Sequence, residues 1–418
     1  MKDEPTVPWQ FLPDLCHFGQ RLAAVRWVSG AIDGGVMKRG MVLKGGLGLV
    51  LLGLAGFIAW VLFLPAAPAA SGAPAIESRE AEAIVAALKP PRRERPVITV
   101  VGINDGTETT DFLMPVGILR RANVGHVITL GFDPGPMTLD PALTVEPDST
   151  VAAFDVRYPD GADYVIVPRM SRDDDPAALT WIRSQAGKGA TIIGDCAGAK
   201  VVGAAGLLDG KRATTHWFFL RQLRRRHPTA IYVPDRRLVV DGNVVTTTGI
   251  TASMPMSLTL IEAIAGRPRA EAGARELRFA SWDARHDSRA FTLTRPFALT
   301  VLGNVLAFWN REELGIELSH GMDEVSLALV ADAWSRTYRS RAVTFARNTG
   351  DIESRNRIRI VPDRGSVSWP PDRLLPASGN LKPADALDGA LAAIEARYGR
   401  RTANVVAMQL EYPKQDAR

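Results

Sequence analysis

The sequence is poor in cysteine. Its 418 residues include only Cys16 and Cys196, which lie far apart along the chain. Two such cysteines exclude the disulfide framework of a small secreted domain. No CxxC pair and no Cys/His cluster has the spacing of a zinc site, so the sequence predicts neither a bound metal nor a cofactor.

The chain also lacks a strongly charged stretch. Its net charge is +5, and basic and acidic residues are interspersed after residue 76. No basic stripe with interleaved aromatic residues is present, so nucleic acid is not an expected partner. The length allows two or three domains.

Residues 45–70 carry no charge. The segment 45–64 is long enough to cross a bilayer, which takes roughly 20 apolar residues. Basic residues flank this segment only on its N-terminal side. The positive-inside rule therefore predicts a cytoplasmic segment 1–44, a transmembrane helix 45–66 and an extracytoplasmic remainder. The protein would be a single-pass inner-membrane protein with a periplasmic domain, joined by a linker at 67–95. A cleaved signal peptide starting at Met37 or Met41 is the alternative, and it leaves the domain on the same side.

The most informative segment is Thr191–Gly206, TIIGDCAGAKVVGAAG. A β-branched run leads into Gly194-Asp195-Cys196-Ala197-Gly198, and a small-residue helix pattern follows. Glycines on both sides of one nucleophilic residue are what a nucleophile elbow requires, because they permit a sharp turn and close packing. We expect the thiol to face the N-terminus of the next helix, where the helix dipole favours a thiolate.

Apolar strands alternate with helices from Pro96 onward, which predicts a doubly wound α/β fold with a parallel sheet covered on both faces. The expected strands are 97–103, 126–132, 163–168 and 191–195, and the expected helices are 112–122 and 176–186. Reactive groups in such sheets collect at the carboxyl ends of the strands, where Cys196 falls.

An internal repeat is also present. Residues 99–148 align without gaps on 314–363 at an offset of 215, and 261–277 align on 394–410 at an offset of 133. The fall in offset means that the second copy lacks 82 residues, the span that carries Cys196 in the first copy. We therefore predict domains at 96–284 and 285–418, the second a degenerate α/β copy without the elbow. Chance similarity between Ala-rich helices is the alternative.

Two groups are candidate partners of the thiol. His216 follows it by twenty residues and is a candidate base or ion-pair partner. An acidic residue after the first strand, Asp111 or Glu108, is a candidate proton-sharing acid, or alternatively only a helix cap or a loop residue.

The segments Cys196–Trp217 and Val239–Gly266 resemble the ThiJ/PfpI superfamily, which has the class I glutamine amidotransferase-like fold. The similarity covers about residues 96–280 and is greatest to the sensor domain of AraC-type regulators. The resemblance implies a flavodoxin-like sheet with Cys196 as the reactive residue, His216 as its neighbour and Asp111 at the position of the first-loop acid. It also makes a homodimer an expectation.

Two positions depart from the family pattern. Enzymatic branches carry Gly-Gly after the strand that reads DYVIVP, whereas this chain has Arg169-Met170. Ala197 replaces the histidine that follows the cysteine in the peptidase branch, so we do not expect proteolysis. Gly194, Ala197 and Arg169 are the residues that we expect beside a substrate or its oxyanion.

Three functions remain open from the sequence. An enzyme would use Cys196, His216 and Asp111 on a small electrophilic carbonyl or amide substrate. A sensor would use the same pocket to bind a small molecule or an oxidant without turnover. A scaffold would bury an inert thiol.

Overall fold

The computed structural model describes residues 56, 58–67, 72–279, 281–347, 350–366, 368–376 and 381–412. No helix within these ranges combines the length and the apolar composition that crossing a bilayer requires. The prediction of a transmembrane helix over 45–66, and of a single-pass inner-membrane location, is therefore wrong on this finding. Of that predicted span only 56 and 58–66 lie in the described part of the chain, and the segment 1–44 with Cys16 lies outside it.

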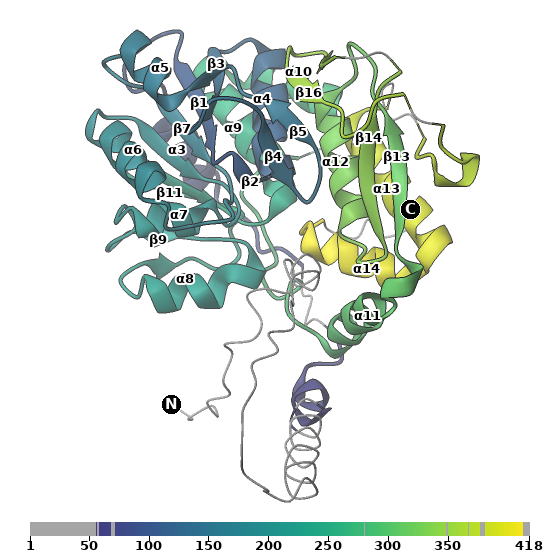
Figure 1. Cartoon of the computed structure of the whole chain (residues 1–418). Helices are drawn as coiled ribbons and strands as arrows, with labels where there is room; N and C mark the ends of the chain where they lie inside the picture. The colour runs from purple at the N-terminus through teal and green to yellow at the C-terminus, as the bar shows by residue number, and fades with distance from the viewer. Residues whose placement is uncertain are drawn as a thin grey trace, which may run out of the picture. The chain divides into compact units, whose positions relative to one another are not determined.

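A seven-stranded sheet forms the centre of the first half, by which we mean residues 96–284 (Figure 1). Its strand order is β11-β12-β8-β7-β1-β3-β6, and only β11 runs antiparallel to its neighbour. The strands are β1 (Val97–Gly102), β3 (His126–Gly131), β6 (Ser149–Thr150), β7 (Tyr164–Val167), β8 (Thr191–Gly194), β11 (Leu238–Asp241) and β12 (Val244–Thr247). The predicted mixed α/β fold with a parallel sheet is confirmed.

Side chains of the central strands alternate between two apolar cores, as the two-residue period of a strand requires. Ile98, Val100 and Ile166 pack on one face, and Val97, Val101 and Val165 pack on the other. The first face is covered by α4 (Thr109–Ala122), α9 (Ser253–Ala265) and α10 (Arg267–Leu277). The second is covered by α5 (Val151–Arg157), α6 (Pro176–Gly187), α7 (Gly198–Ala204) and α8 (Leu220–Arg226).

The second half, residues 285–418, contributes a smaller α/β unit. Its strands β13 (Glu312–Glu317) and β14 (Ser340–Phe345) pair in parallel. Its helices are α11 (Arg295–Leu306), α12 (Glu324–Ser335), α13 (Pro383–Tyr398) and α14 (Arg400–Gln409). Helix α12 packs against α4, so the two halves are joined through their helices (Figure 1).

A five-stranded sheet also joins the two halves. Its order is β15-β16-β5-β4-β2. The first half supplies β2 (Asp105–Glu108), β4 (Met137–Asp140) and β5 (Thr144–Glu146), and the second supplies β15 (Ile352–Glu353) and β16 (Arg359–Val361).

The predicted linker contains a helix. Helix α3 (Ser78–Ala87) packs against α9, and Glu80 forms an ion pair with Arg236 at 2.7 Å. The helix forms because its sequence, SREAEAIVAA, is rich in the good helix formers alanine and glutamate.

Two glycines allow the turn after β8. A Cβ at Gly198 would lie 1.8 Å from the carbonyl oxygen of Val167, and a Cβ at Gly194 would lie 2.9 Å from the backbone of Ala199. Both approaches are made to backbone, which cannot swing aside as a flexible side chain can. The turn therefore requires glycine at both positions, as the sequence spacing indicated.

We expect Gly198→Ala to lower the free energy of unfolding by about 3 kcal/mol or more, because overpacking against fixed backbone forces the strand and helix apart. Gly187→Ala is the matched control, since a Cβ there meets nothing within 4 Å. Urea unfolding of the full chain measures both. Equal midpoints for the two variants would contradict this account of the elbow.

Candidate active site

Cys196 lies at the carboxyl end of β8 in the middle of the large sheet. Its φ is 55°, a conformation that few non-glycine residues adopt, and its side chain is buried. The backbone N–H of Cys196 donates to Thr247 Oγ1 at 2.9 Å, and its carbonyl accepts from Thr215 Oγ1 at 2.9 Å. Strain of this kind persists where surrounding contacts hold it, and it is frequent at functional sites.

Glu108 is the last residue of β2, and Asp111 lies in the first turn of α4. Both are buried, and Glu108 Oε2 accepts the backbone N–H of Asp111 at 2.6 Å, so Glu108 is the N-cap of α4. Asp111 Oδ2 accepts the N–H of Arg169 at 3.4 Å. Within the described residues, Asp111 Oδ1 has no hydrogen-bond donor.

The surroundings keep the thiol protonated. Burial raises the pKa of Cys196 well above its ordinary value, and Asp111 is the charged group that raises it most after burial, followed by Glu108. This corrects the expectation of a thiolate held by a helix dipole. Helix α7 has only two turns, whereas several carboxyl groups lie close to the sulfur.

Asp111 is held as a neutral acid by the same surroundings. Burial, and then the charges of Glu108 and Asp195, raise its pKa well above the usual aspartate value. A protonated carboxyl group beside a protonated thiol is a proton donor, not a base.

Asp195 adds a second raised acid next to the thiol. Its Oδ1 accepts a 2.5 Å hydrogen bond from Thr247 Oγ1, and burial raises the pKa of Asp195 to about 7. Thr247 thus connects the Asp195 carboxyl to the backbone N–H of Cys196.

His216 has both ring nitrogens engaged away from the thiol. Its Nε2 is 2.9 Å from the carbonyl oxygen of Gln409, and its Nδ1 accepts the N–H of Phe218 at 3.1 Å. The carbonyl partner requires the proton on Nε2, which leaves Nδ1 as an occupied acceptor. His216 therefore anchors the C-terminal segment, and its assigned role as base has no support in these contacts.

Arg169 does not present a free cation to the site. Its Nη1 donates to Asp140 at 2.8 Å, and its N–H is directed at Asp111. Gly194 and Ala197 flank Cys196 as the motif requires, and both lie in the buried turn. Their predicted contact with a substrate or oxyanion stays a prediction.

The second half supplies charged side chains that the sequence motifs do not include. Arg336, which follows α12, donates to Glu108 Oε1 at 2.6 Å and lies 2.7 Å from Asp332. Burial raises the pKa of Asp332 to about 8. Glu411 is also buried and accepts the N–H of Trp217 at 2.8 Å.

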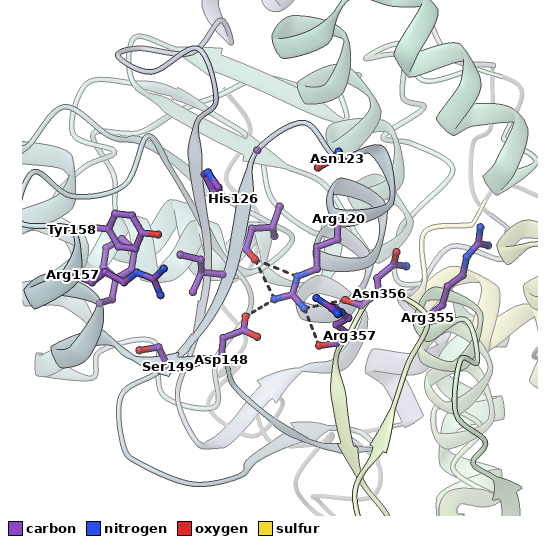
Figure 2. A pocket seen from close by; sticks show the side chains of 14 residues that line it. Arg120, Asn123, His126, Asp148, Ser149, Arg157, Tyr158, Arg355, Asn356 and Arg357 are labelled. Atoms are coloured by element: carbon purple, nitrogen blue, oxygen red, sulfur yellow. Dashed lines mark hydrogen bonds and ion pairs between the residues drawn. The ribbon is translucent and has the colours of Figure 1, made fainter.

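A separate cavity of about 610 Å³ lies along β3 and β6. Figure 2 shows Arg120 at its wall, where the guanidinium binds Asp148 and the carbonyls of Val127, Asn356 and Arg357. These bonds tie β3 to the turn before β16, so we assign Arg120 to the joint between the halves. Within the described ranges, no three His, Cys, Asp or Glu side chains are grouped as a metal site would need.

Comparison with known proteins finds matches over the first half. The sequence profile of the DJ-1/PfpI family matches residues 98–263. An isonitrile hydratase from Pseudomonas putida is 37% identical over 175 residues, which are 41% of this chain and 73% of that protein. The HTH-type transcriptional regulator CdhR from Pseudomonas aeruginosa is 30% identical over 161 residues, 37% of this chain and 47% of the regulator.

Solved structures match the same region. DJ-1beta from Drosophila melanogaster is 24% identical with a TM-score of 0.40, over 45% of this chain and all of that one. An AraC family transcriptional regulator from Pseudomonas putida is 20% identical with a TM-score of 0.39, over 44% of this chain and 98% of the other.

We expect Cys196 to show little thiolate at neutral pH, with an apparent pKa above the free value of about 8.5. Asp111→Asn should move the titration to lower pH, because asparagine cannot take on the negative charge that opposes ionisation of the thiol. The readout is the ultraviolet absorbance of the thiolate, taken as the difference from a Cys196→Ala chain. Asp155→Asn, whose carboxylate binds Trp181 on another part of the sheet, is the control and should leave the titration unchanged. A thiolate already present at pH 7 would refute this description of the site.

Proposed function

Because this chain belongs to the DJ-1/PfpI family, we propose that its first half catalyses the Cys196-dependent addition of water to a small electrophilic carbon. The favoured substrate class is an isonitrile, and small carbonyl or amide compounds are the wider class. Support comes from the 37% identity to an isonitrile hydratase over most of that protein's length. It also comes from the chemistry of the buried pair.

The observation that carries the proposal is Asp111, a buried acid of raised pKa with one oxygen lacking a hydrogen-bond donor among the described residues. The terminal carbon of an isonitrile is a nucleophile that becomes electrophilic once protonated. A neutral acid that donates a proton to this carbon, beside a thiol that then adds to it, meets both demands.

The proposed reaction balances as follows. Asp111 gives its proton to the terminal carbon, the sulfur of Cys196 forms a bond to that carbon, and the thiol proton passes to the Asp111 carboxylate. The product of this step is a thioimidate. Water then adds across the carbon–nitrogen double bond, with its hydroxyl on the carbon and its proton on the nitrogen. The carbon–sulfur bond breaks, and the hydroxyl proton passes to sulfur. The released product is an N-substituted formamide.

We also propose that the second half is a shortened copy of the first and has no catalytic centre of its own. Supporting this, α4 begins at Thr109 and α12 at Glu324, and β1 begins at Val97 and β13 at Glu312, each 215 residues apart. The joints at Gly266 and Gly399, 133 residues apart, have nearly equal φ of 83° and 88°.

A polar cross-link is repeated at the same spacing. Asp148 accepts both the N–H and the hydroxyl of Thr129, and Asp363 does the same with Thr344. Both pairs are separated by 19 residues and are offset by 215. Chance similarity between helices does not account for a shared cross-link of this kind.

A non-catalytic sensor is the second candidate, and the observation that favours it is the protonated, buried thiol. A thiol of raised pKa reacts slowly unless a bound compound is itself activated. The similarity to a transcriptional regulator is consistent with ligand binding. A sensor of this kind would bind a small molecule saturably and would not convert it to a product.

We expect the full-length chain to convert a small alkyl isonitrile to its formamide, measured by infrared loss of the isonitrile stretch and by chromatography of the product. Cys196→Ala should abolish conversion. Asp111→Asn should slow it by about 10²-fold or more, which is the usual contribution of a general acid.

His216→Gln separates our mechanism from the histidine-base scheme. We expect the rate of isonitrile conversion to change only a few-fold after correction for the folded fraction, because the ring already binds Gln409 and Phe218. A loss equal to that of Cys196→Ala would favour the histidine base. Saturable binding without formamide would establish the sensor instead.

A further inference from the structure

Two ion pairs join helices α4 and α12. In each pair, an arginine near the C-terminal end of one helix binds the N-cap residue of the other helix. Arg121 on α4 binds Asp323, the N-cap of α12, at 2.5 Å. Arg336, which caps the C-terminus of α12, binds Glu108, the N-cap of α4, at 2.6 Å. Arg336 stands 215 residues after Arg121, and Asp323 stands 215 after Glu108, so the pairs are equivalent positions of the two halves.

Strands β5 and β16 also meet through equivalent positions of the two halves. These strands pair antiparallel, with Val145 opposite Ile360, which is again an offset of 215. A contact in which equivalent residues of two units face one another is an isologous, two-fold interface. The second half thus occupies the place that a second subunit would take in a symmetric dimer.

Only one of the two ion pairs lies at a thiol. Glu108 uses one carboxylate oxygen for Arg336 and the other for the N–H of Asp111. At the equivalent end of α12, Asp323 accepts the N–H of Ser326, which stands where Asp111 does in the first half. The interface pair is therefore retained in both halves, whereas the acid is present in one.

We propose that Arg336 is a positioning residue for the thiol site, acting from the second half through the Glu108 carboxylate on Asp111 and Cys196. The inference builds on the proposed function, since it assigns the second half a part in that site. Arg336 holds the Glu108 side chain in place, and Glu108 in turn accepts the backbone N–H of Asp111 in the first turn of α4. The proposal is specific to the pair at the thiol and not to the interface in general.

The balance of charge around the sulfur explains why this cation matters. Among the described residues, Asp111, Glu108, Asp195 and Glu411 are the carboxyl groups that most oppose ionisation of the sulfur. Arg169 directs its N–H at Asp111, and its guanidinium is paired with Asp140. Arg336 is the cation bound to the buried Glu108, so its removal makes the site more negative.

The test compares equivalent substitutions in the full-length chain with Cys16 replaced by serine, so that Cys196 is the sole thiol. Arg336→Gln should slow alkylation of Cys196 about ten-fold at fixed pH, because loss of the cation disfavours the thiolate. Arg121→Gln removes the equivalent ion pair and should leave the rate unchanged. Arg336→Lys should restore most of the rate.

A second pair of variants distinguishes an effect on the thiol from a loss of folding. Glu108→Gln removes the anion while keeping the shape of the cap, and should lower the thiol pKa, an effect opposite to that of Arg336→Gln. Asp323→Asn is its matched control and should have no effect. Urea unfolding of all variants measures the shared structural cost.

The proposal is overturned if Arg336→Gln and Arg121→Gln alter the alkylation profile equally, or if Glu108→Gln and Asp323→Asn do. Equal effects would assign both pairs to the interface alone. The alkylation profile requires no substrate, so a chain that fails to hydrate isonitriles can still support or refute this inference.

Discussion

The packing of α4 against α12 is the contact on which the site depends. Helix α4 brings Glu108 and Asp111 to the sulfur, and its first turn is held by Glu108, which itself binds Arg336 from the far end of α12. A buried carboxylate is stable only when a cation or several donors satisfy it. The second half is therefore part of the environment of the thiol, although it carries no cysteine.

That environment is unusually acidic for a thiol site. Glu108, Asp111, Asp195 and Asp332 are all 0–1% exposed. Burial raises the pKa of Asp111, Asp195 and Asp332, and it also raises the pKa of the Cys196 thiol. Chemistry that begins with proton donation suits such a site better than chemistry that begins with a preformed thiolate.

Much of the first half was predictable because its signals are local. The apolar runs at 97–103 and 191–195 form strands β1 and β8, and the glycines around Cys196 make the backbone approaches that the turn needs. The prediction made from hydropathy at 45–66 is wrong, since no helix among the described residues is long and apolar enough to cross a bilayer. His216 was assigned to the thiol from its spacing, whereas the carbonyl that fixes its ring lies 193 residues away.

Local signals in the sequence were enough to predict the parallel sheet and the elbow around Cys196. They were enough because strand period and close backbone packing depend on neighbouring residues. Only the tertiary structure decided the state of that thiol, because a pKa depends on burial and on charges that the fold brings together. Arg336 and Glu108 are 228 residues apart in the chain and 2.6 Å apart in space. No local pattern in the sequence specifies such a contact.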